Sequence, residues 1–255
     1  MRYIWAGFFC LLIGAACAAE SAELHAVLLI DSEAENIETA MVKNHRRWQK
    51  QFLKISGHTG MKVHEHAFVG KKLLSVEVLP FLESLEIDSD DVVLLYFCGH
   101  GYRTKQKNNP WPYMCWSHEN IAIDLMLLTK ILEEKQPRLL IALAECCNNY
   151  IDSQSLDLVT EQTGQKRRHI MKANYCKLFL ESEGVIVASS SHPGEFSWAW
   201  VDRGSCFTLA FLDCIEKEVR QRDGTEWAII FEQASTKVRD LQSPQYILDC
   251  DYSAP

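Results

Sequence analysis

The chain has little basic charge, and after its amino-terminal segment it lacks an apolar run long enough to span a membrane. Of its 255 residues, 26 are Lys or Arg and 34 are Asp or Glu, which gives a formal net charge of −8. Only the short run Lys166-Arg167-Arg168 is dense in basic side chains, so no nucleic-acid partner is expected. Charge interrupts every later apolar run within about a dozen residues, which predicts a mature form that does not span a membrane.

Two short motifs are also missing. The segment Ser189-Ser190-Ser191-His192 lacks the flanking glycines of a Gly-x-Ser-x-Gly elbow, which argues against a serine nucleophile. No pair of cysteines has the spacing of two to four intervening residues that zinc sites use. A zinc site built from Cys98, His100, Cys146 and Cys147 is kept as an alternative because thiolate and imidazole suit zinc. Adjacent strand residues point to opposite faces, however, so no metal site is expected.

Composition indicates a folded α/β protein. Apolar residues make up 47% of the chain and charged residues 24%, enough to bury a full core in a single domain or in two small ones. Ten cysteines are present, and eight remain if Cys10 and Cys17 are removed with a leader. In a domain of this size buried free cysteines behave as small hydrophobic residues, so at most one or two disulfides are expected.

The amino terminus has the pattern of a secretory signal. Arg2 precedes an apolar stretch over 3–17, and Ala16-Cys17-Ala18 supplies the small residues of a cleavage site. We therefore expect residues 1–19 to be a signal peptide and the mature chain, 20–255, to be exported. An uncleaved membrane anchor and a lipid on Cys17 are the alternatives.

The remaining chain alternates between strand and helix patterns, without an internal repeat. The expected strands are 25–31, 61–69, the runs that start at Val92 and Leu139, and 184–189; the expected helices are 35–55, 76–85, 123–135, 170–181, 207–222 and 227–241; 105–116 is expected to be a loop. A polar connection over about 150–169 divides the chain into a larger part, up to about 150, and a smaller part from about 170 to 255. The alternation predicts one three-layer α/β/α domain with a mostly parallel central sheet.

Two apolar runs end in reactive side chains. Gly99-His100-Gly101 follows the run from Val92, and Cys146-Cys147 follows the run from Leu139. Runs without period-2 polarity are typical of strands buried on both faces of a parallel sheet. Reactive groups collect at the carboxyl ends of such strands, so we expect His100 and Cys147 to face each other there. This is the geometry that a cysteine nucleophile requires.

Three ordered blocks resemble the caspase and metacaspase family of cysteine peptidases. They are Gly99-His100-Gly101, the acid-x-Cys block Glu145-Cys146-Cys147, and the segment 188–198 followed by Gly204-Ser205-Cys206-Phe207-Thr208. The separation of 47 residues between His100 and Cys147 also fits the roughly 50 residues of that family. The resemblance covers nearly the whole mature chain and implies a caspase-like α/β/α fold.

The resemblance also implies roles for individual residues. Cys147 matches the nucleophile, and His100 matches the residue that holds and transfers the proton. The backbone N–H groups of Gly101 and Cys147 match the oxyanion hole. Cys146 is expected to be a buried neighbour, since only one of two adjacent cysteines can readily face His100. An inactive relative that binds peptides or a partner protein is the alternative.

Substrate preference is expected to differ from that of caspases. Where caspases carry an arginine that binds the substrate aspartate, this chain has Ala199. Glu145 matches the acid of metacaspases that pairs with a basic residue, so cleavage after Arg or Lys is expected. Asp31 and Glu195 are further candidate acids, with surface carboxylates as the alternative reading. Legumain-like peptidases also carry an acid at this position and leave cleavage after Asn as a second specificity.

The same resemblance suggests how the substrate is held and how the chain matures. Ser197 and Trp198 match residues that hold an extended peptide by β-strand addition. Lys166, Arg167 and Arg168 fall where relatives are cut during maturation and would suit self-cleavage, with a solvated charge run as the alternative. No acidic cluster resembling a calcium site follows His100, so no cofactor is required and calcium activation is left open. The expected partner is a peptide or protein substrate; monomer and dimer stay open.

Overall fold

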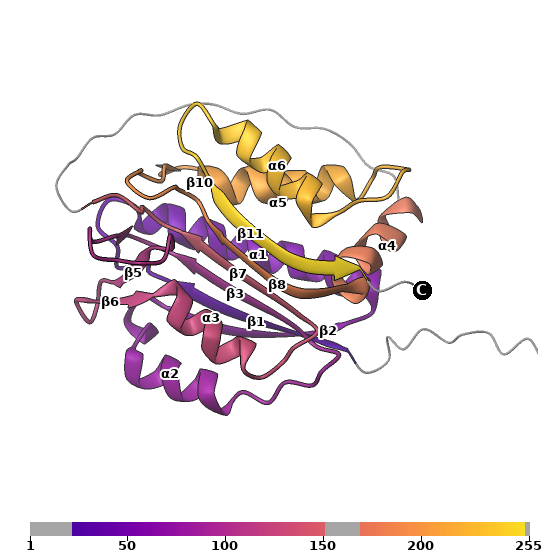
Figure 1. Ribbon diagram of the computed structural model, residues 1–255, viewed down its shortest axis with the longest axis horizontal. Helices are drawn as coiled ribbons and strands as arrows, with labels where there is room; N and C mark the ends of the chain where they lie inside the picture. The colour runs from indigo at the N-terminus through magenta and orange to yellow at the C-terminus, as the bar shows by residue number, and fades with distance from the viewer. Residues whose placement is uncertain (1–21, 151–168, 253–255) are drawn as a thin grey trace, which may run out of the picture.

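The computed structural model describes residues 22–150 and 169–252 (Figure 1). The strands are β1 (Glu23–Ile30), β2 (Lys62–Val69), β3 (Val92–Cys98), β4 (Gly101–Tyr102), β5 (Tyr113–Trp116), β6 (Ile121–Asp124), β7 (Leu139–Glu145), β8 (Ser182–Ser189), β9 (Ala199–Trp200), β10 (Gly204–Ser205) and β11 (Gln245–Tyr252). The helices are α1 (Glu38–Thr59), α2 (Ser75–Ser84), α3 (Leu125–Glu133), α4 (His169–Cys176), α5 (Cys206–Glu218) and α6 (Trp227–Val238), with short helical turns at Gly70–Lys72 and Lys177–Glu181.

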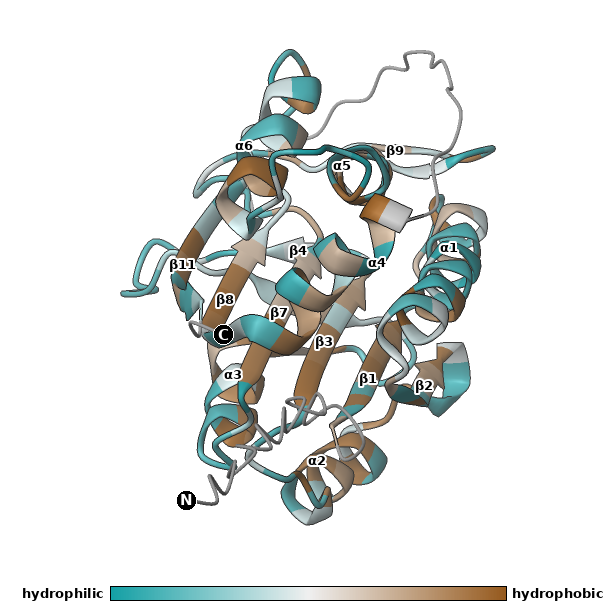
Figure 2. Ribbon diagram, turned by 90° about the vertical axis from the view of Figure 1, so that its right-hand side faces the viewer, coloured by the Kyte–Doolittle hydropathy of each residue, from teal (hydrophilic) through white to brown (hydrophobic). Residues whose placement is uncertain are grey.

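A six-stranded sheet forms the centre of the molecule, in the order β11-β8-β7-β3-β1-β2. All neighbouring strands are parallel except β11, which runs antiparallel to β8. Every residue of β3 and β7 is buried, as the uninterrupted apolar runs predict. Figure 2 shows these central strands as the hydrophobic interior of the fold.

Helices cover both faces of this sheet. Side chains of α1, α4, α5 and α6 pack on one face, and those of α2 and α3 pack on the other. Successive residues of β3 alternate between these two cores, with Leu94 on the α1 face and Leu95 on the α2 face. The predicted three-layer α/β/α fold with a mostly parallel sheet is thereby confirmed.

The structure differs from the sequence-based expectation in the following segments. The helix expected over 123–135 begins later, because Ile121–Asp124 is the strand β6 and α3 starts at Leu125, where the Asp124 side chain accepts a hydrogen bond from the N–H of Met126. Tyr113–Trp116 is a strand inside the predicted loop, because it pairs with both β4 and β6. Gln245–Tyr252 forms the edge strand β11, which was not predicted. Its sequence does alternate over the last residues, with Leu248, Cys250 and Tyr252 separated by Asp249 and Asp251.

Several expectations concern residues outside the described ranges. The expected signal peptide and the basic run at 166–168 lie there. Within 22–150 and 169–252, none of the helices combines the length and the hydrophobicity needed to cross a membrane. The eight cysteines in these ranges are all free thiols.

Candidate active site

His100 and Cys147 follow two neighbouring parallel strands in matching positions. Cys98 at the end of β3 lies opposite Glu145 at the end of β7, and the pairing resumes as a bridge between Arg103 and Tyr150. Both pairs are offset by the same number of residues as His100 and Cys147. The register therefore places the imidazole-bearing residue and the thiol-bearing residue side by side, on segments about 5 Å apart.

The orientation of His100 is fixed by a main-chain carbonyl. Nε2 of His100 lies 2.8 Å from the carbonyl oxygen of Glu35, in the turn between β1 and α1. A carbonyl only accepts hydrogen bonds, so Nε2 carries the proton and Nδ1 is left as the basic nitrogen. The following residue, Asn36, has a left-handed backbone with φ of 70°, which shapes the turn that presents this carbonyl.

The Cys147 thiol lies against the segment that follows β8. The backbone N–H of Ser197 is 3.3 Å from Sγ of Cys147, and Sγ is 3.6 Å from the Ser197 carbonyl oxygen. Burial raises the pKa of the Cys147 thiol, the hydrogen bond from Ser197 opposes this rise, and the neighbouring Glu145 carboxylate adds to it. In the resting protein this group is therefore a thiol that needs a base to become a nucleophile.

Cys146 is held on the other side of the strand. It is 2% exposed and belongs to the core formed with α2 and α3. Its N–H donates to the Ser190 hydroxyl, which in turn donates to the Cys146 carbonyl. Burial raises the pKa of this thiol well above its usual range. Cys146 is thus a structural residue, and Cys147 is the cysteine at the open end of the strand.

Close approach of the two segments requires a glycine at position 101. A Cβ there would lie 2.5 Å from Sγ of Cys146 and 2.7 Å from the carbonyl oxygen of Cys147. The backbone N–H of Gly99 bonds to the Glu145 carbonyl and that of Arg103 to the Asn149 carbonyl. Between these bonds, within the described part of the chain, the N–H groups of Gly101 and Cys147 make no backbone hydrogen bond to the opposite segment. The ladder between the two segments is therefore interrupted at these two residues.

Glu145 lies beneath this thiol and is almost fully enclosed. It is 3% exposed; one oxygen accepts the N–H and the hydroxyl of Thr208, both at 2.6 Å, and the other accepts the Ser197 hydroxyl at 2.8 Å. Burial raises the pKa of the Glu145 carboxyl, while the bonds from Thr208 and Ser197 oppose the rise. A small cavity adjoins Glu145 and is lined by Trp48, Tyr96, Leu143, Ala144, Phe207, Thr208 and Phe211.

The other candidate acids are occupied by different partners. Asp31 is 1% exposed, and its carboxylate accepts the N–H and hydroxyl of Ser117 at 3.1 and 2.6 Å. The Glu195 carboxylate accepts the N–H and hydroxyl of Ser243. Neither Asp31 nor Glu195 is hydrogen-bonded to Glu145 or to Cys147. Ser197, in contrast, is hydrogen-bonded to both Glu145 and Cys147.

Trp198 is bonded to the loop between α6 and β11. Its N–H donates to the Gln242 side chain at 2.8 Å, and its carbonyl accepts the N–H of Cys206. These bonds leave Trp198 half-buried beside Ser197. Ser197 therefore lies next to the thiol, and Trp198 after it is fixed by these two bonds.

The residues of the zinc alternative do not converge. Cys98 belongs to the core on the α1 face, and Cys146 belongs to the core on the α2 face. Across residues 22–150 and 169–252, no three His, Cys, Asp or Glu side chains are grouped so that they could hold a metal ion.

Sequence reasoning missed three residues of this region. Thr208 holds Glu145, and Arg103 and Asn148 form a buried hydrogen bond between the segments that carry His100 and Cys147. Thr208 lies in one of the motif blocks, although no role was assigned to it. Arg103 and Asn148 carry no motif signal, because their contact depends on the conformation of a loop.

Comparisons with known proteins agree with this geometry. The family model described as the caspase domain matches residues 49–249, a range that contains His100 and Cys147. Among solved structures, caspase-1 from Spodoptera frugiperda is similar, with a TM-score of 0.57 and 16% sequence identity over 91% of this chain and 90% of that chain. Comparison with curated protein sequences gives no match.

Proposed function

The chain belongs to the caspase-domain family of cysteine peptidases, and from that membership we propose that it is an endopeptidase that uses His100 and Cys147 and cleaves after a basic residue. The observation that carries the proposal is the shared register of these two residues at the ends of β3 and β7. A nucleophile and a base that closely follow two rigid neighbouring strands meet the requirement for preorganised catalysis.

In the proposed first step, Sγ of Cys147 attacks the carbonyl carbon of the scissile peptide bond. The thiol proton passes to Nδ1 of His100, whose Nε2–H stays bonded to the Glu35 carbonyl and so steadies the imidazolium. The N–H groups of Gly101 and Cys147 donate to the oxygen on which negative charge develops.

Collapse of this intermediate breaks the C–N bond and leaves an acyl-enzyme on Cys147. His100 gives its proton to the leaving amine nitrogen and becomes a base again. It then takes a proton from water, whose oxygen attacks the thioester carbon. Collapse expels the sulfur, which recovers the proton from His100, and the carboxylic acid product leaves.

Glu145 supports the proposed preference for Arg or Lys on the amino side of the cleaved bond. Ser197 and Thr208 hold its carboxylate two residues before the nucleophile, and Ser190 also stabilises its charged form. A guanidinium or ammonium donor would gain a charge-assisted hydrogen bond there. An amide donor from Asn is the competing substrate, whereas an Asp carboxylate would meet repulsion.

The test is cleavage of fluorogenic peptides that end in Arg, Lys, Asn or Asp, with and without calcium. We expect turnover after Arg or Lys by the wild type, none by Cys147→Ala, and turnover close to wild type by the matched control Cys146→Ala. Activity retained in Cys147→Ala would remove the proposed nucleophile. Inactivity with every peptide would favour a relative that only binds peptides or a partner protein.

We also propose that the protein is exported, which rests on Arg2 and the apolar stretch over 3–17. Expression of the full chain with a carboxy-terminal tag, followed by amino-terminal sequencing of the exported product, tests this. A mature end near residue 20 is expected, and an intact Met1 in a retained protein would contradict it.

A further inference from the structure

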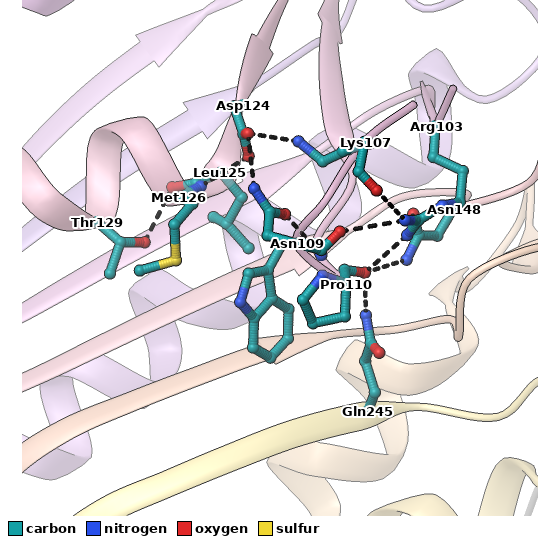
Figure 3. Close-up of polar contacts among 11 residues, drawn as sticks. Arg103, Lys107, Asn109, Pro110, Asp124, Leu125, Met126, Thr129, Asn148 and Gln245 are labelled. Carbon is teal, nitrogen blue, oxygen red and sulfur yellow. Dashed lines mark hydrogen bonds and ion pairs between the residues drawn. The ribbon is translucent and has the colours of Figure 1, made fainter. Parts of the chain in front are cut away.

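Arg103 makes a buried hydrogen-bond network that joins the two catalytic segments. It lies three residues after His100, is 6% exposed, and its guanidinium donates to the Asn148 side chain at 3.3 Å. The same group donates to the carbonyl oxygens of Lys107, Asn109 and Pro110 at 3.1 to 3.2 Å. Figure 3 shows these acceptors gathered around the one side chain.

Asn148 is the immediate neighbour of the nucleophile and is completely buried. Its side-chain amide donates to the carbonyl oxygens of Pro110 and Ser191, at 2.8 and 3.4 Å. Its main-chain N–H donates to the Glu195 carbonyl, and its own carbonyl accepts the N–H of Gly194. Asn148, the residue that follows Cys147, is therefore held through both its side chain and its backbone.

The carbonyl oxygen of Pro110 connects three parts of the fold. It accepts hydrogen bonds from Arg103 at 3.1 Å, from Asn148 at 2.8 Å and from the Gln245 side chain at 2.7 Å (Figure 3). Gln245 is the first residue of β11, so the loop that carries Pro110 is fixed between the histidine segment, the cysteine segment and the edge strand.

The charge of Arg103 is met by dipoles. Among the described residues, the carboxylate in this network, Asp124, pairs with Lys107 and accepts from Asn109. The guanidinium is instead surrounded by amide and carbonyl oxygens, and a planar group with five donors can bind several of them at once. A lysine ammonium has three donors on a flexible chain and cannot reproduce this pattern.

From these contacts we propose that Arg103 is a positioning residue that sets the alignment of His100 with Cys147 through Asn148. The proposal rests on the proposed peptidase function and adds a determinant of its turnover. The main-chain N–H of Arg103 also donates to the Asn149 carbonyl at 2.9 Å. The side chain and the backbone of Arg103 therefore bind the consecutive residues Asn148 and Asn149. A displacement of this segment by about 1 Å is enough to lower turnover by about a hundredfold.

The experiment compares Arg103→Met, Arg103→Lys, Asn148→Ala and the double variant Arg103→Met/Asn148→Ala with the wild type. The matched control is Asn174→Ala in α4. It removes a buried asparagine amide that donates to the carbonyl oxygens of Val219 and Gln221. Thermal unfolding reports the stability of each variant. Peptide cleavage gives kcat and KM, and mass spectrometry gives the rate at which iodoacetamide alkylates Cys147 at about pH 7 and about pH 10.

We expect Arg103→Met to lower kcat at least about tenfold with KM within about twofold, and Arg103→Lys to recover part of the loss. Alkylation of Cys147 should slow at neutral pH, where His100 must take the thiol proton, and should be unchanged at alkaline pH, where hydroxide removes it. The double variant should lose no more than the larger single effect. Asn174→Ala should lower the melting temperature and leave kcat and alkylation unchanged.

A normal kcat and normal alkylation of Cys147 in folded Arg103→Met would overturn the proposal, as would faster alkylation at both pH values, which marks simple loosening. If Arg103→Met does not fold, Asn148→Ala tests the same link from the other side, with the same expected and contrary results. If the wild type cleaves no peptide, the alkylation data still decide: a change at neutral pH only supports positioning while the peptidase proposal fails.

Discussion

The main-chain N–H of Ser197 lies 3.3 Å from Sγ of Cys147, although 50 residues separate them along the chain. The hydroxyl of the same serine donates to Glu145 at 2.8 Å. One residue thus contacts both the proposed nucleophile and the proposed specificity acid. A thiolate that accepts this N–H is stabilised, which partly offsets the burial that keeps Cys147 protonated.

The first prediction concerns the titration of Cys147. Because burial raises the pKa of this thiol, alkylation of Cys147 by iodoacetamide should reach half its maximal rate at a higher pH in the folded protein than in urea. Mass spectrometry of the Cys147 peptide over a range of pH measures both midpoints. If the midpoint pH of Cys147 alkylation were lower in the folded protein than in urea, the folded protein would instead stabilise the Cys147 thiolate.

The second prediction concerns Glu145. Replacing it with Gln keeps its shape and removes its charge, so kcat/KM for peptides ending in Arg should fall roughly 10- to 100-fold, the value of one hydrogen bond to a charged group. Turnover after Asn should fall much less. Glu195→Gln makes the same charge change at a carboxylate bound to Ser243 and should leave the preference unchanged. Equal losses for Arg and Asn peptides would deny Glu145 a role in specificity.

The third prediction concerns Gly101. A Cβ at this position would collide with Cys146 and with the Cys147 carbonyl, so Gly101→Ala should separate the two segments and lower kcat at least about a hundredfold. At Gly57 in α1 an added Cβ would meet nothing within 4 Å apart from its own stretch of helix backbone, and Gly57→Ala should keep activity and gain about 0.5–1 kcal/mol of stability. Peptide cleavage and urea unfolding measure both effects. Full activity in Gly101→Ala would contradict the close approach.

The fourth prediction separates structure from specificity at Asp31. Asp31→Ala leaves the part-buried N–H and hydroxyl of Ser117 without their acceptor and should lower the free energy of unfolding by about 1–3 kcal/mol. The exposed Asp213→Ala should change it by less than about 0.5 kcal/mol. Urea unfolding compares the two. A stable Asp31→Ala variant with altered cleavage preference would instead place Asp31 in the substrate pocket.

The fifth prediction concerns stacked histidines on β1 and β2. The ring of His25 lies 5.1 Å from that of His64 and 6.0 Å from that of His66. Burial, together with the charges of His25 and His64, lowers the pKa of His66 below its ordinary 6.5. The unfolded chain therefore binds more protons in this range, so stability is greatest above pH 6.5 and falls as the pH drops through the folded value.

Urea unfolding of the wild type and of His66→Gln at several pH values between about 5 and 8 tests this. The variant should lose less stability on acidification than the wild type. His25 and His64 pair with the carboxylates of Asp91 and Glu23, and both pairs are present in the wild type and in the variant. His118→Gln, at an exposed position, is the control and should behave as the wild type. If His66→Gln lost more stability on acidification than the wild type, the pH dependence would not come from a lowered pKa of His66.

The strands that carry the site could be predicted because their signal is local. The apolar runs from Val92 and Leu139 are buried on both faces, and such runs fit a central parallel strand in almost any context. The strands β5 and β6 could not be predicted in the same way, since Ile121 and Ile123 suit a helix as well as a strand. Their pairing with each other decided the matter.

The site divides along the same line. Sequence by itself determined the chemistry available at the sheet edge: a histidine and a cysteine that follow buried strands, a glycine beside them and an acid two residues before the thiol. Tertiary structure alone decided which groups these side chains meet. The Glu35 carbonyl at His100, the enclosure of Glu145 by Thr208, and the contact of Arg103 with Asn148 join residues distant in the chain. Such contacts depend on how loops pack against the sheet, and no local pattern of residues encodes that packing.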